Sequence, residues 1–192
     1  MEKFKDLAVL ILAAGTSSRL GEPKQLLKYK GESLIKIAVK KAMKLTPNVT
    51  VVLGHQATTI IKEIIDLQIA ITVNPRFKEG IGRSIAFGIN ETKKYENTLI
   101  MLCDQPFIPV EHFKKLIDKH DKLLVASQYG TYPTVPVIFS KKYYPELLKL
   151  EGDKGARELL RREDTPIVKL DKKYAVDIDT KEDAQKYLKE IE

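Results

Sequence analysis

Residues 7–24, LAVLILAAGTSSRLGEPK, place a turn of small side chains next to two cations, Arg19 and Lys24. Small side chains let the backbone approach a ligand closely, and Gly15 tolerates backbone angles that other residues avoid. Backbone N–H groups close to positive charge favour the binding of phosphate oxygens. These residues therefore predict an anion-binding loop directly after the apolar run at residues 7–12.

Two well-known phosphate-binding patterns are absent from this loop. No Gly-Lys-Ser/Thr sequence closes it, so it is not a Walker A loop. Gly-x-Gly-x-x-Gly does not follow the apolar run, so it is not a dinucleotide fingerprint either. The alternative is an ordinary strand-to-helix turn whose lysine and arginine are only solvated, and single residue types do not exclude it.

A carboxylate occupies a comparable position further along the chain. Asp104 follows the apolar run at residues 98–103 and precedes Gln105 and Pro106. Pro106 favours extended geometry at the residue before it, which ends the strand and fixes the direction of Asp104. Because open α/β sheets bind ligands at the carboxyl ends of their strands, Asp104 is a candidate magnesium ligand. The alternative is an aspartate that only caps the next turn.

The elements that would position these residues alternate between strands and helices. Apolar runs predict strands at residues 7–12, 49–53, 69–73, 98–103, 123–127 and 174–178, and a further strand that ends at Ser140. Spacing and capping residues predict helices at residues 34–45, 58–67, 110–120 and 141–150, one from Gly80 towards Ile89, one near Gly152, and a last one capped by Asp179 or Thr180. This order predicts an α/β fold with a mostly parallel sheet.

The composition of the chain limits its size class and its partners. A length of 192 residues suits one domain with a real core. The net charge is +7, but the lysines are spread along the chain, which favours anionic small substrates over nucleic acid. No apolar stretch approaches the length that spans a bilayer, and the N-terminus lacks the layout of an export signal, so a cytoplasmic location is expected.

The cysteine and the histidines are not expected to act in catalysis. Cys103 is the single cysteine, which excludes an intrachain disulfide, and it is expected to be a packing residue. His112 and His120 are expected on the surface of the helix at residues 110–120. His55 follows the second strand and could line the rim of a cleft.

Four motifs occur in order along nearly the whole chain: LAAG-x-S-x-R-x-G-x-x-K at residues 12–24, LCDQPF at residues 102–107, GDKGAR at residues 152–157 and DIDT at residues 177–180. Together they resemble the molybdenum cofactor cytidylyltransferases within the MobA-like NTP transferases. The resemblance implies a Rossmann-like three-layer sandwich with a mostly parallel, mixed sheet, as in the nucleotide-diphospho-sugar transferases. It also implies a single nucleotidyltransferase domain over residues 1–192.

The resemblance assigns catalytic and metal-binding roles. Lys24, Arg19 and Asp104 are the expected catalytic residues. Asp104 and Asp179 are the expected ligands of Mg²⁺, the implied cofactor. Asp177 is the alternative to Asp179, since a strand at residues 174–178 would turn both carboxylates to the same side.

Substrate-binding residues are implied in the same way. The residues expected to hold the nucleotide are Leu12, Ala13, Ala14, Gly15, Ser17, Ser18, Lys24, Asn74, Gly80 and Ser84. Gly80 and Gly82 precede a helix and suit close approach by an anion or a base edge. Lys154 and Arg157, in GDKGAR, are expected to contact the phosphate of the acceptor.

The reaction implied by the resemblance transfers CMP from CTP to the terminal phosphate of molybdopterin and releases pyrophosphate. Ala14 stands where the guanylyltransferases of the family typically have a glycine, which implies a pyrimidine nucleotide. CTP and molybdopterin are therefore the implied substrates. Transient contact with a molybdoenzyme or a cofactor-insertion protein is implied as well.

One departure from the family pattern leaves the acceptor open. The family usually has Gly-His before Pro-Val-Leu-Phe, whereas Thr134 and Val135 precede Pro136 here. One alternative is the same reaction on another phosphorylated acceptor, such as a sugar or polyol phosphate. Another is a nucleotide-binding regulator without turnover, although the intact Lys24 and Asp104 argue against it.

Overall fold

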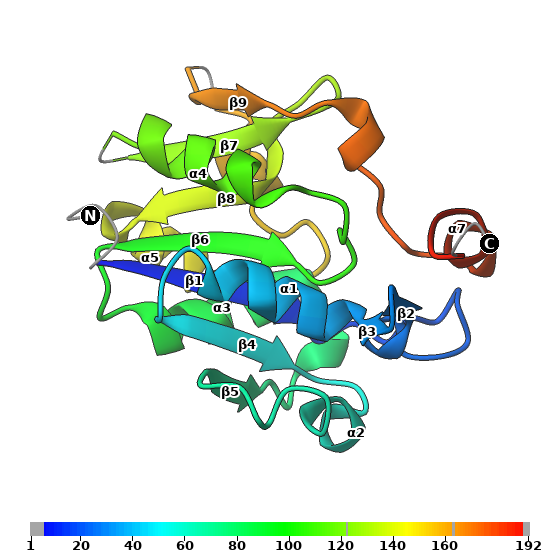
Figure 1. Cartoon of the computed structure of the whole chain (residues 1–192). Helices are drawn as coiled ribbons and strands as arrows, with labels where there is room; N and C mark the ends of the chain where they lie inside the picture. The colour runs from blue at the N-terminus through cyan, green and yellow to red at the C-terminus, as the bar shows by residue number, and fades with distance from the viewer. Residues whose placement is uncertain (1–5, 122, 163, 190–192) are drawn as a thin grey trace.

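The computed structural model describes residues 6–121, 123–162 and 164–189. Its strands are β1 (Leu7–Ala13), β4 (Val49–Leu53), β5 (Ala70–Val73), β6 (Asn97–Leu102), β7 (Leu124–Gln128), β8 (Thr134–Ser140) and β9 (Ile167–Lys169). They form a sheet of seven strands in the order β5-β4-β1-β6-β8-β7-β9, from bottom to top in Figure 1. Only β8 runs antiparallel to its neighbours, β6 and β7. The predicted mixed, mostly parallel sheet is therefore confirmed.

Strand β1 has core on both of its faces. All seven of its residues are buried. Because successive side chains point to opposite faces of a sheet, Val9 and Ile11 pack into one apolar cluster, and Leu10 and Leu12 pack into another. A strand in this position has no solvent-facing side, which explains the unbroken apolar run in the sequence.

Helices cover both faces of the sheet. One face is covered by α1 (Leu34–Met43) and α4 (Val110–Lys119), and the other by α3 (Ile81–Thr92) and α5 (Tyr144–Leu147), as Figure 1 shows. Val39 and Leu116 pack into the cluster that contains Val9, while Ile89 and Leu147 pack into the other cluster. The arrangement is the predicted three-layer sandwich.

The chain changes direction across the sheet beside β1. It leaves β1 through α1 to reach β4 on one side, and it returns from β5 through α3 to reach β6 on the other side. The loops after β1 and β6 therefore separate at the carboxyl ends of two adjacent parallel strands. Open α/β sheets bind ligands at such a point.

Shorter elements complete the description. They are the hairpin of β2 (Lys28–Tyr29) and β3 (Glu32–Ser33), the helices α2 (Ala57–Ile61), α6 (Arg157–Leu160) and α7 (Lys181–Tyr187), and 3-10 turns at Lys24–Leu26, Phe77–Glu79, Lys141–Tyr143 and Lys172–Tyr174. Among the residues that the structure describes, no helix is long and apolar enough to cross a bilayer.

Two predicted helices are shorter in the structure. Helix α2 ends at Ile61 and not at residue 67, and four of its five residues are β-branched, which restricts their side-chain rotamers in a helix. The predicted helix at residues 141–150 is divided into a 3-10 turn at Lys141–Tyr143 and the short helix α5. Pro145 lies in the first turn of α5. Proline fits there, where its missing N–H would have no helical partner.

The predicted strand at residues 174–178 is wrong. The last strand is β9, which pairs with β7, and the chain then leaves the sheet towards α7 (Figure 1). Ile178 is fully buried and packs with Leu34 and Leu188. Val176 and Ile178 therefore reflect packing near α7, Tyr174 and Ala175 pack against the cluster that contains Val9, and none of them pairs in the sheet.

Candidate active site

Ser17 holds the loop after β1 in shape through its hydroxyl and its backbone carbonyl. Ser17 has a left-handed backbone, with φ of 54°, and its Oγ accepts a hydrogen bond from the Lys24 backbone N–H at 3.1 Å. Its carbonyl accepts bonds from the N–H groups of Leu20 and Gly21. A Cβ added to Gly15 would meet no atom within 4 Å, so the loop backbone is open to a ligand there.

Gln25 fastens this loop to β1, and sequence reasoning missed it. Its side chain is fully buried, and Nε2 donates hydrogen bonds to the carbonyls of Ala13 at 2.7 Å and Gly15 at 3.2 Å. The sequence signal is slight, since it consists of one amide between Lys24 and the apolar residues 26–27.

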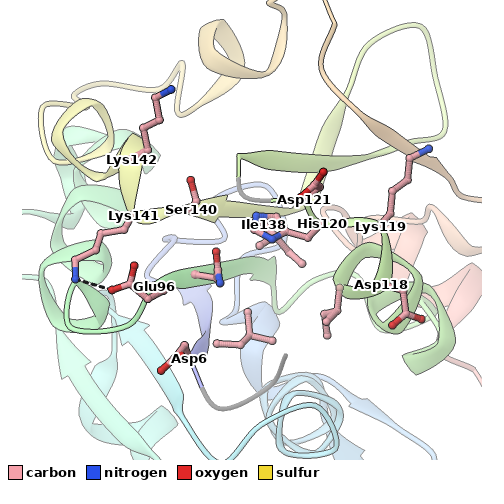
Figure 2. A pocket seen from close by; sticks show the side chains of 13 residues that line it. Asp6, Glu96, Asp118, Lys119, His120, Asp121, Ile138, Ser140, Lys141 and Lys142 are labelled. Atoms are coloured by element: carbon pink, nitrogen blue, oxygen red, sulfur yellow. Dashed lines mark hydrogen bonds and ion pairs between the residues drawn. The ribbon is translucent and has the colours of Figure 1, made fainter. Parts of the chain in front are cut away.

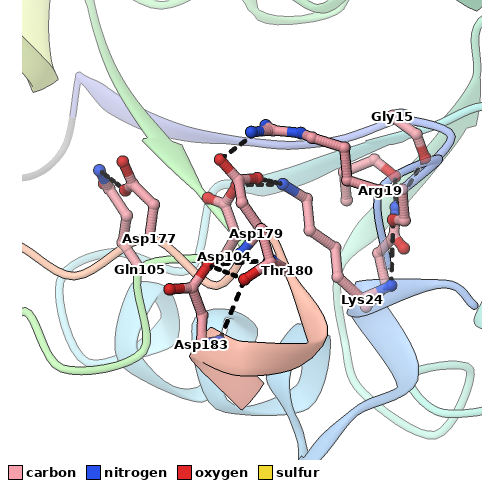
Figure 3. Close-up of polar contacts among 12 residues, drawn as sticks. Gly15, Arg19, Lys24, Asp104, Gln105, Asp177, Asp179, Thr180 and Asp183 are labelled. Carbon is pink, nitrogen blue, oxygen red and sulfur yellow. Dashed lines mark hydrogen bonds and ion pairs between the residues drawn. The ribbon is translucent and has the colours of Figure 1, made fainter. Parts of the chain in front are cut away.

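Lys24 joins two carboxylates that are far apart in the sequence (Figure 3). Its Nζ contacts Asp104 Oδ2 and donates to Asp179 Oδ1 at 2.8 Å. Arg19 Nη2 donates to Asp179 Oδ2 at 3.0 Å. The structure thus brings the expected catalytic and metal-binding residues into one group of two cations and two anions, which we call the charged cluster.

Burial strengthens the ion pairs of the charged cluster. The side chains of Lys24, Asp104 and Asp179 are 16%, 11% and 32% exposed, whereas that of Arg19 is 69% exposed. Burial alone would lower the pKa of Lys24, but Asp104 and Asp179 outweigh it and raise that pKa well above its usual value. Burial would raise the pKa of Asp179, but Lys24 and Arg19 lower it. Lys24 and Asp179 are therefore both charged at neutral pH.

Three hydrogen bonds fix the loop that carries Asp104. Lys41, on α1, donates from Nζ to the carbonyls of Pro106 and Ile108, the latter at 2.7 Å. Burial lowers the pKa of Lys41 to about 8. The Asp104 carbonyl accepts a hydrogen bond from the Ile178 N–H at 3.0 Å. The loop is thereby attached both to α1 and to the segment that precedes α7.

The capping box of α7 positions Asp179. Thr180 Oγ1 accepts a hydrogen bond from the Asp183 N–H at 3.1 Å. Asp183 Oδ2 accepts from the N–H groups of Thr180 at 2.9 Å and Asp179 at 3.2 Å. The prediction of a cap at this position is confirmed.

Asp177 belongs to a different set of contacts. It accepts a hydrogen bond from Gln105 Nε2 at 2.8 Å, and Figure 3 shows this pair apart from the Lys24 ammonium. Because residues 174–178 are not a strand, Asp177 and Asp179 do not share a strand face. The structure brings Asp179 to Asp104 and leaves Asp177 outside the charged cluster.

A cavity of about 330 Å³ lies beside the charged cluster and is lined by both Lys24 and Asp104. We call it the nucleotide cavity, because seven of the ten residues expected to hold the nucleotide line it: Leu12, Ala13, Ala14, Gly15, Lys24, Gly80 and Ser84. Gln25 lines it too.

The other three expected nucleotide residues do not line this cavity. Ser17 shapes the loop, as described above, and Ser18 is exposed. Asn74 is buried, and its Nδ2 donates to Ser84 Oγ at 3.2 Å while its Oδ1 accepts from the Arg76 N–H at 2.9 Å. Asn74 therefore helps to fix the position of the Ser84 hydroxyl and does not line the cavity itself.

A second cavity, of about 180 Å³, adjoins the nucleotide cavity and shares Leu12, Ile81, Leu102 and Asp153 with it. We call it the acceptor cavity, because the expected acceptor residues Lys154 and Arg157 line it. Both of these residues are exposed. The other polar residues along its wall are Gln105, Tyr129, Thr134 and Asp177.

The glycines at the start of α3 accommodate another part of the chain. A Cβ on Gly80 would lie 2.4 Å from the carbonyl of Gly152, and one on Gly82 would lie 2.6 Å from the carbonyl oxygen of Glu151. The Gly82 N–H donates to the Gly152 carbonyl at 2.8 Å. The close approach that the sequence attributed to an anion or a base edge is therefore made by the backbone of residues 151–152.

His112 does not lie on the surface, contrary to the prediction. It is 4% exposed, and its Nε2 donates to Ser127 Oγ at 2.8 Å, because that hydroxyl donates in turn to the Pro136 carbonyl. Burial lowers the pKa of His112 to about 4, so the ring is neutral at pH 7. Cys103 is buried, as predicted, and burial raises its pKa to about 12.

Figure 2 shows a larger cavity of about 730 Å³, at the opposite edge of the sheet. It lies near the amino ends of β1 and β6, and its lining carries charges of both signs, including the ion pair of Lys141 with Glu96 at 2.9 Å. His120 also lines it. None of the four motifs contributes a lining residue, so we place the candidate active site at the smaller nucleotide cavity.

The sequence matches the family model of the MobA-like NTP transferase domain over residues 9–167. The chain belongs to this family. The MobA-like chain is 26% identical to the purine catabolism protein PucB of Bacillus subtilis (strain 168) over 162 residues, 79% of either protein. It is 22% identical to the molybdenum cofactor cytidylyltransferase of Escherichia coli (strain K12) over 176 residues, 91% of either protein.

A solved structure shows the same fold. Rv0371c from Mycobacterium tuberculosis H37Rv, in complex with manganese, matches the MobA-like chain with a TM-score of 0.76 and 22% identity. The match covers 96% of this chain and 98% of Rv0371c. The three-layer fold expected for a nucleotidyltransferase is therefore shared by a protein that has been crystallised with a divalent metal.

The charged cluster of this MobA-like nucleotidyltransferase offers Mg²⁺ one carboxylate oxygen that is not paired with Lys24 or Arg19. Asp104 Oδ1 is buried and has no hydrogen-bond partner in the described part of the chain. No group of three or more candidate metal ligands occurs among the described residues, but Mg²⁺ typically binds one or two carboxylates and completes its shell with water and substrate phosphates. Asp104 and Asp179 therefore fit a magnesium ion that is shared with a triphosphate.

Proposed function

We propose that this MobA-like nucleotidyltransferase transfers CMP from CTP to the terminal phosphate of molybdopterin and releases pyrophosphate. The observation that carries the proposal is the charged cluster beside two adjoining cavities, one lined by LAAG and the other by residues of GDKGAR. Two such cavities suit a nucleotide donor and a phosphorylated acceptor. The Escherichia coli relative, a molybdenum cofactor cytidylyltransferase, supports this choice of donor and acceptor.

The proposed chemistry depends on positioning and charge. A terminal phosphate oxygen of the acceptor attacks the α-phosphorus of CTP in line, the bond from that phosphorus to the β-phosphate oxygen breaks, and pyrophosphate leaves. Lys24 and Arg19 supply positive charge to the phosphates. Asp104 and Asp179 would hold Mg²⁺, which would supply further charge neutralisation on the triphosphate.

This reaction needs no general base, because the attacking phosphate oxygen is already ionised at neutral pH. The proposal accordingly gives no role as a base to His112 or Cys103. The His112 imidazole is buried and bonded to Ser127, and the Cys103 thiol, with a pKa of about 12, stays protonated. Neither residue forms a hydrogen bond with the charged cluster in the described structure.

The preference for CTP rests on Ala14. Ala14 is 5% exposed and lines the nucleotide cavity. A methyl group at this position reduces the space beside the loop, where a two-ring base needs more room than a pyrimidine. A pyrimidine nucleotide therefore suits the cavity better.

The composition of the acceptor cavity supports a flat acceptor that carries phosphate. The Tyr129 ring and the Gln105 amide provide a surface and hydrogen bonds for a pterin, and Lys154 and Arg157 provide charge for its phosphate. A sugar or polyol phosphate is the second candidate acceptor, because the unusual Thr134 and Val135 also line this cavity.

Pyrophosphate release tests both candidates. Each of the four nucleoside triphosphates is assayed with molybdenum-bound molybdopterin, with a panel of sugar and polyol phosphates, and without acceptor. We expect release with CTP and molybdopterin, and its loss in Asp104→Asn. Release only with a sugar or polyol phosphate would select the second candidate, and binding of CTP without release for any acceptor would favour a regulator without turnover.

A further inference from the structure

The charged cluster leaves little of its carboxylate surface available. Asp179 Oδ1 contacts Lys24 at 2.8 Å and Asp179 Oδ2 contacts Arg19 at 3.0 Å. Asp104 Oδ2 contacts Lys24 as well. Of the four carboxylate oxygens, only Asp104 Oδ1 is without a partner in the described structure. The Lys24 ammonium therefore lies between the two carboxylates, where a cation shared by both would lie.

This arrangement is already balanced in charge. Two cations face two carboxylates, and three of the four side chains are two-thirds or more buried. A divalent cation that entered between Asp104 and Asp179 would compete with the Lys24 ammonium, because the ammonium lies between the two carboxylates and takes one oxygen of each. Repulsion between two cations at a few ångströms is strong where water is largely excluded.

We infer that Lys24 is a built-in counter-cation that keeps divalent metal away from Asp104 and Asp179 until a nucleoside triphosphate enters. The inference rests on the proposed function, because it takes these two carboxylates as the metal ligands. It adds an order to the binding steps. Metal binds tightly only together with the nucleotide, and in the free protein Lys24 and Arg19 together balance the charge of the carboxylate pair.

The position of Lys24 allows this exchange. Its backbone N–H is fixed to Ser17 Oγ at 3.1 Å, while the residue as a whole lines the nucleotide cavity. Its long side chain can therefore turn from the carboxylates to phosphate oxygens without movement of the loop. A triphosphate offers the ammonium new charge-assisted hydrogen bonds in place of the two it gives up.

Manganese binding without nucleotide tests the inference. Mn²⁺ is titrated into the full-length protein, and the free ion is followed by its electron paramagnetic resonance signal. We expect weak binding by the wild type and at least tenfold tighter binding by Lys24→Met, which keeps the length of the side chain but removes its charge. Adding Asp104→Asn to Lys24→Met should remove the gain.

Lys78→Met is the matched control. Lys78 lines the same cavity, but in the described part of the chain it forms no ion pair with either carboxylate. We expect its affinity for Mn²⁺ to stay within about twofold of the wild-type value, since loss of one more distant charge is screened by solvent and salt. Thermal unfolding confirms that each variant is folded, and Lys24→Ala replaces Lys24→Met if the latter is not.

Two results would overturn the inference. One is equal Mn²⁺ affinity in the wild type and Lys24→Met, and the other is a gain that persists when Asp104→Asn is added. The assay contains no nucleotide and no acceptor, so an error in the proposed base or acceptor leaves its outcome unchanged. Failure of the proposed function would appear instead in the pyrophosphate assay.

Discussion

Replacing Asp104 with asparagine tests the chemistry of the charged cluster most directly. The substitution keeps the volume of the side chain and removes its charge. This carboxylate is held by Lys24 through one oxygen, and its second, buried oxygen has no partner among the residues that the structure describes. The variant should therefore lose the charge on which metal and lysine depend, while the loop that carries residue 104 stays attached through Lys41 and Ile178.

The effect on stability is expected to be small. A hydrogen bond to a charged group contributes about 1.5–3 kcal/mol to the free energy of unfolding. Part of that loss is offset, because Lys24 keeps its contact with Asp179 at 2.8 Å and a buried charge is removed. We expect the free energy of unfolding of Asp104→Asn to fall by about 1–2 kcal/mol.

The effect on turnover is expected to be large. Removal of one preorganised charged group typically lowers kcat by about 10²–10³, and loss of a metal ligand adds to that. We expect pyrophosphate release to fall by at least about a thousandfold at saturating Mg²⁺ and CTP. Urea unfolding of the same preparation separates this effect from misfolding.

Asp177→Asn is the matched control for this experiment. It neutralises a carboxylate two residues from Asp179 that bonds to Gln105 and not to Lys24. Because Asp177 lines the acceptor cavity, its loss should appear in the KM for the acceptor. Its kcat at saturating acceptor should stay within about tenfold of the wild-type value, since no charge of the charged cluster is removed. Near-normal turnover in Asp104→Asn, or equal losses in the two variants, would refute the assignment of Asp104 and Asp179 as the pair that acts on the triphosphate.

Three further predictions follow from the same structure. Lys24→Ala should slow the chemical step by about a hundredfold or more, because a charge that faces the phosphates is lost. Single-turnover kinetics measure the rate of this step. A change confined to the affinity for the acceptor would contradict the prediction. The wild type should prefer CTP to GTP by more than about tenfold in kcat/KM, since an extra methyl group in a tight site costs about 1–3 kcal/mol. Ala14→Gly should reduce that preference. If the ratio of kcat/KM for CTP to that for GTP is the same in the variant, Ala14 does not select the base. His112 has a pKa of about 4 in the folded protein, below its value of about 6.5 in the unfolded chain. The neutral ring therefore contributes its full stabilisation above about pH 6.5. About 3 kcal/mol of the free energy of unfolding is lost as the pH falls through 4. Urea unfolding at pH 7 and pH 4.5 should show a smaller acid loss in His112→Gln than in the wild type, and equal losses would contradict the buried neutral ring.

The sequence predicted the central part of the fold because the relevant signals are local and strong. Residues 7–12 and 99–103 are continuous apolar runs, and only a strand with core on both faces needs such a run. The ends of these strands then locate the LAAG loop and Asp104 at one edge of the sheet. The motif resemblance added Lys24 and Asp179, which no periodicity connects, and the structure brings both to Asp104.

What the sequence did not predict depends on partners that are distant in the chain. Gln25 and Lys41 act on backbone carbonyls, which have no signature in the sequence. The surface position predicted for His112 neglected its spacing, since it lies four residues before Leu116 and one before Phe113, on the buried stripe of α4. Val176 and Ile178 resembled a strand because their apolar side chains alternate, but they pack near α7 outside the sheet.

The contact between α3 and residues 151–152 has a consequence for anyone who wishes to redesign this enzyme. The backbone of residues 151–152 occupies the space that a side chain at Gly80 or Gly82 would need. Residues 151–152 and the start of α3 therefore fit each other closely. If residues 151–157 were replaced by those of a relative with another acceptor, the new segment would pack correctly only against a helix that begins with the same two glycines. An exchange of substrate range would have to transplant both halves of the contact together.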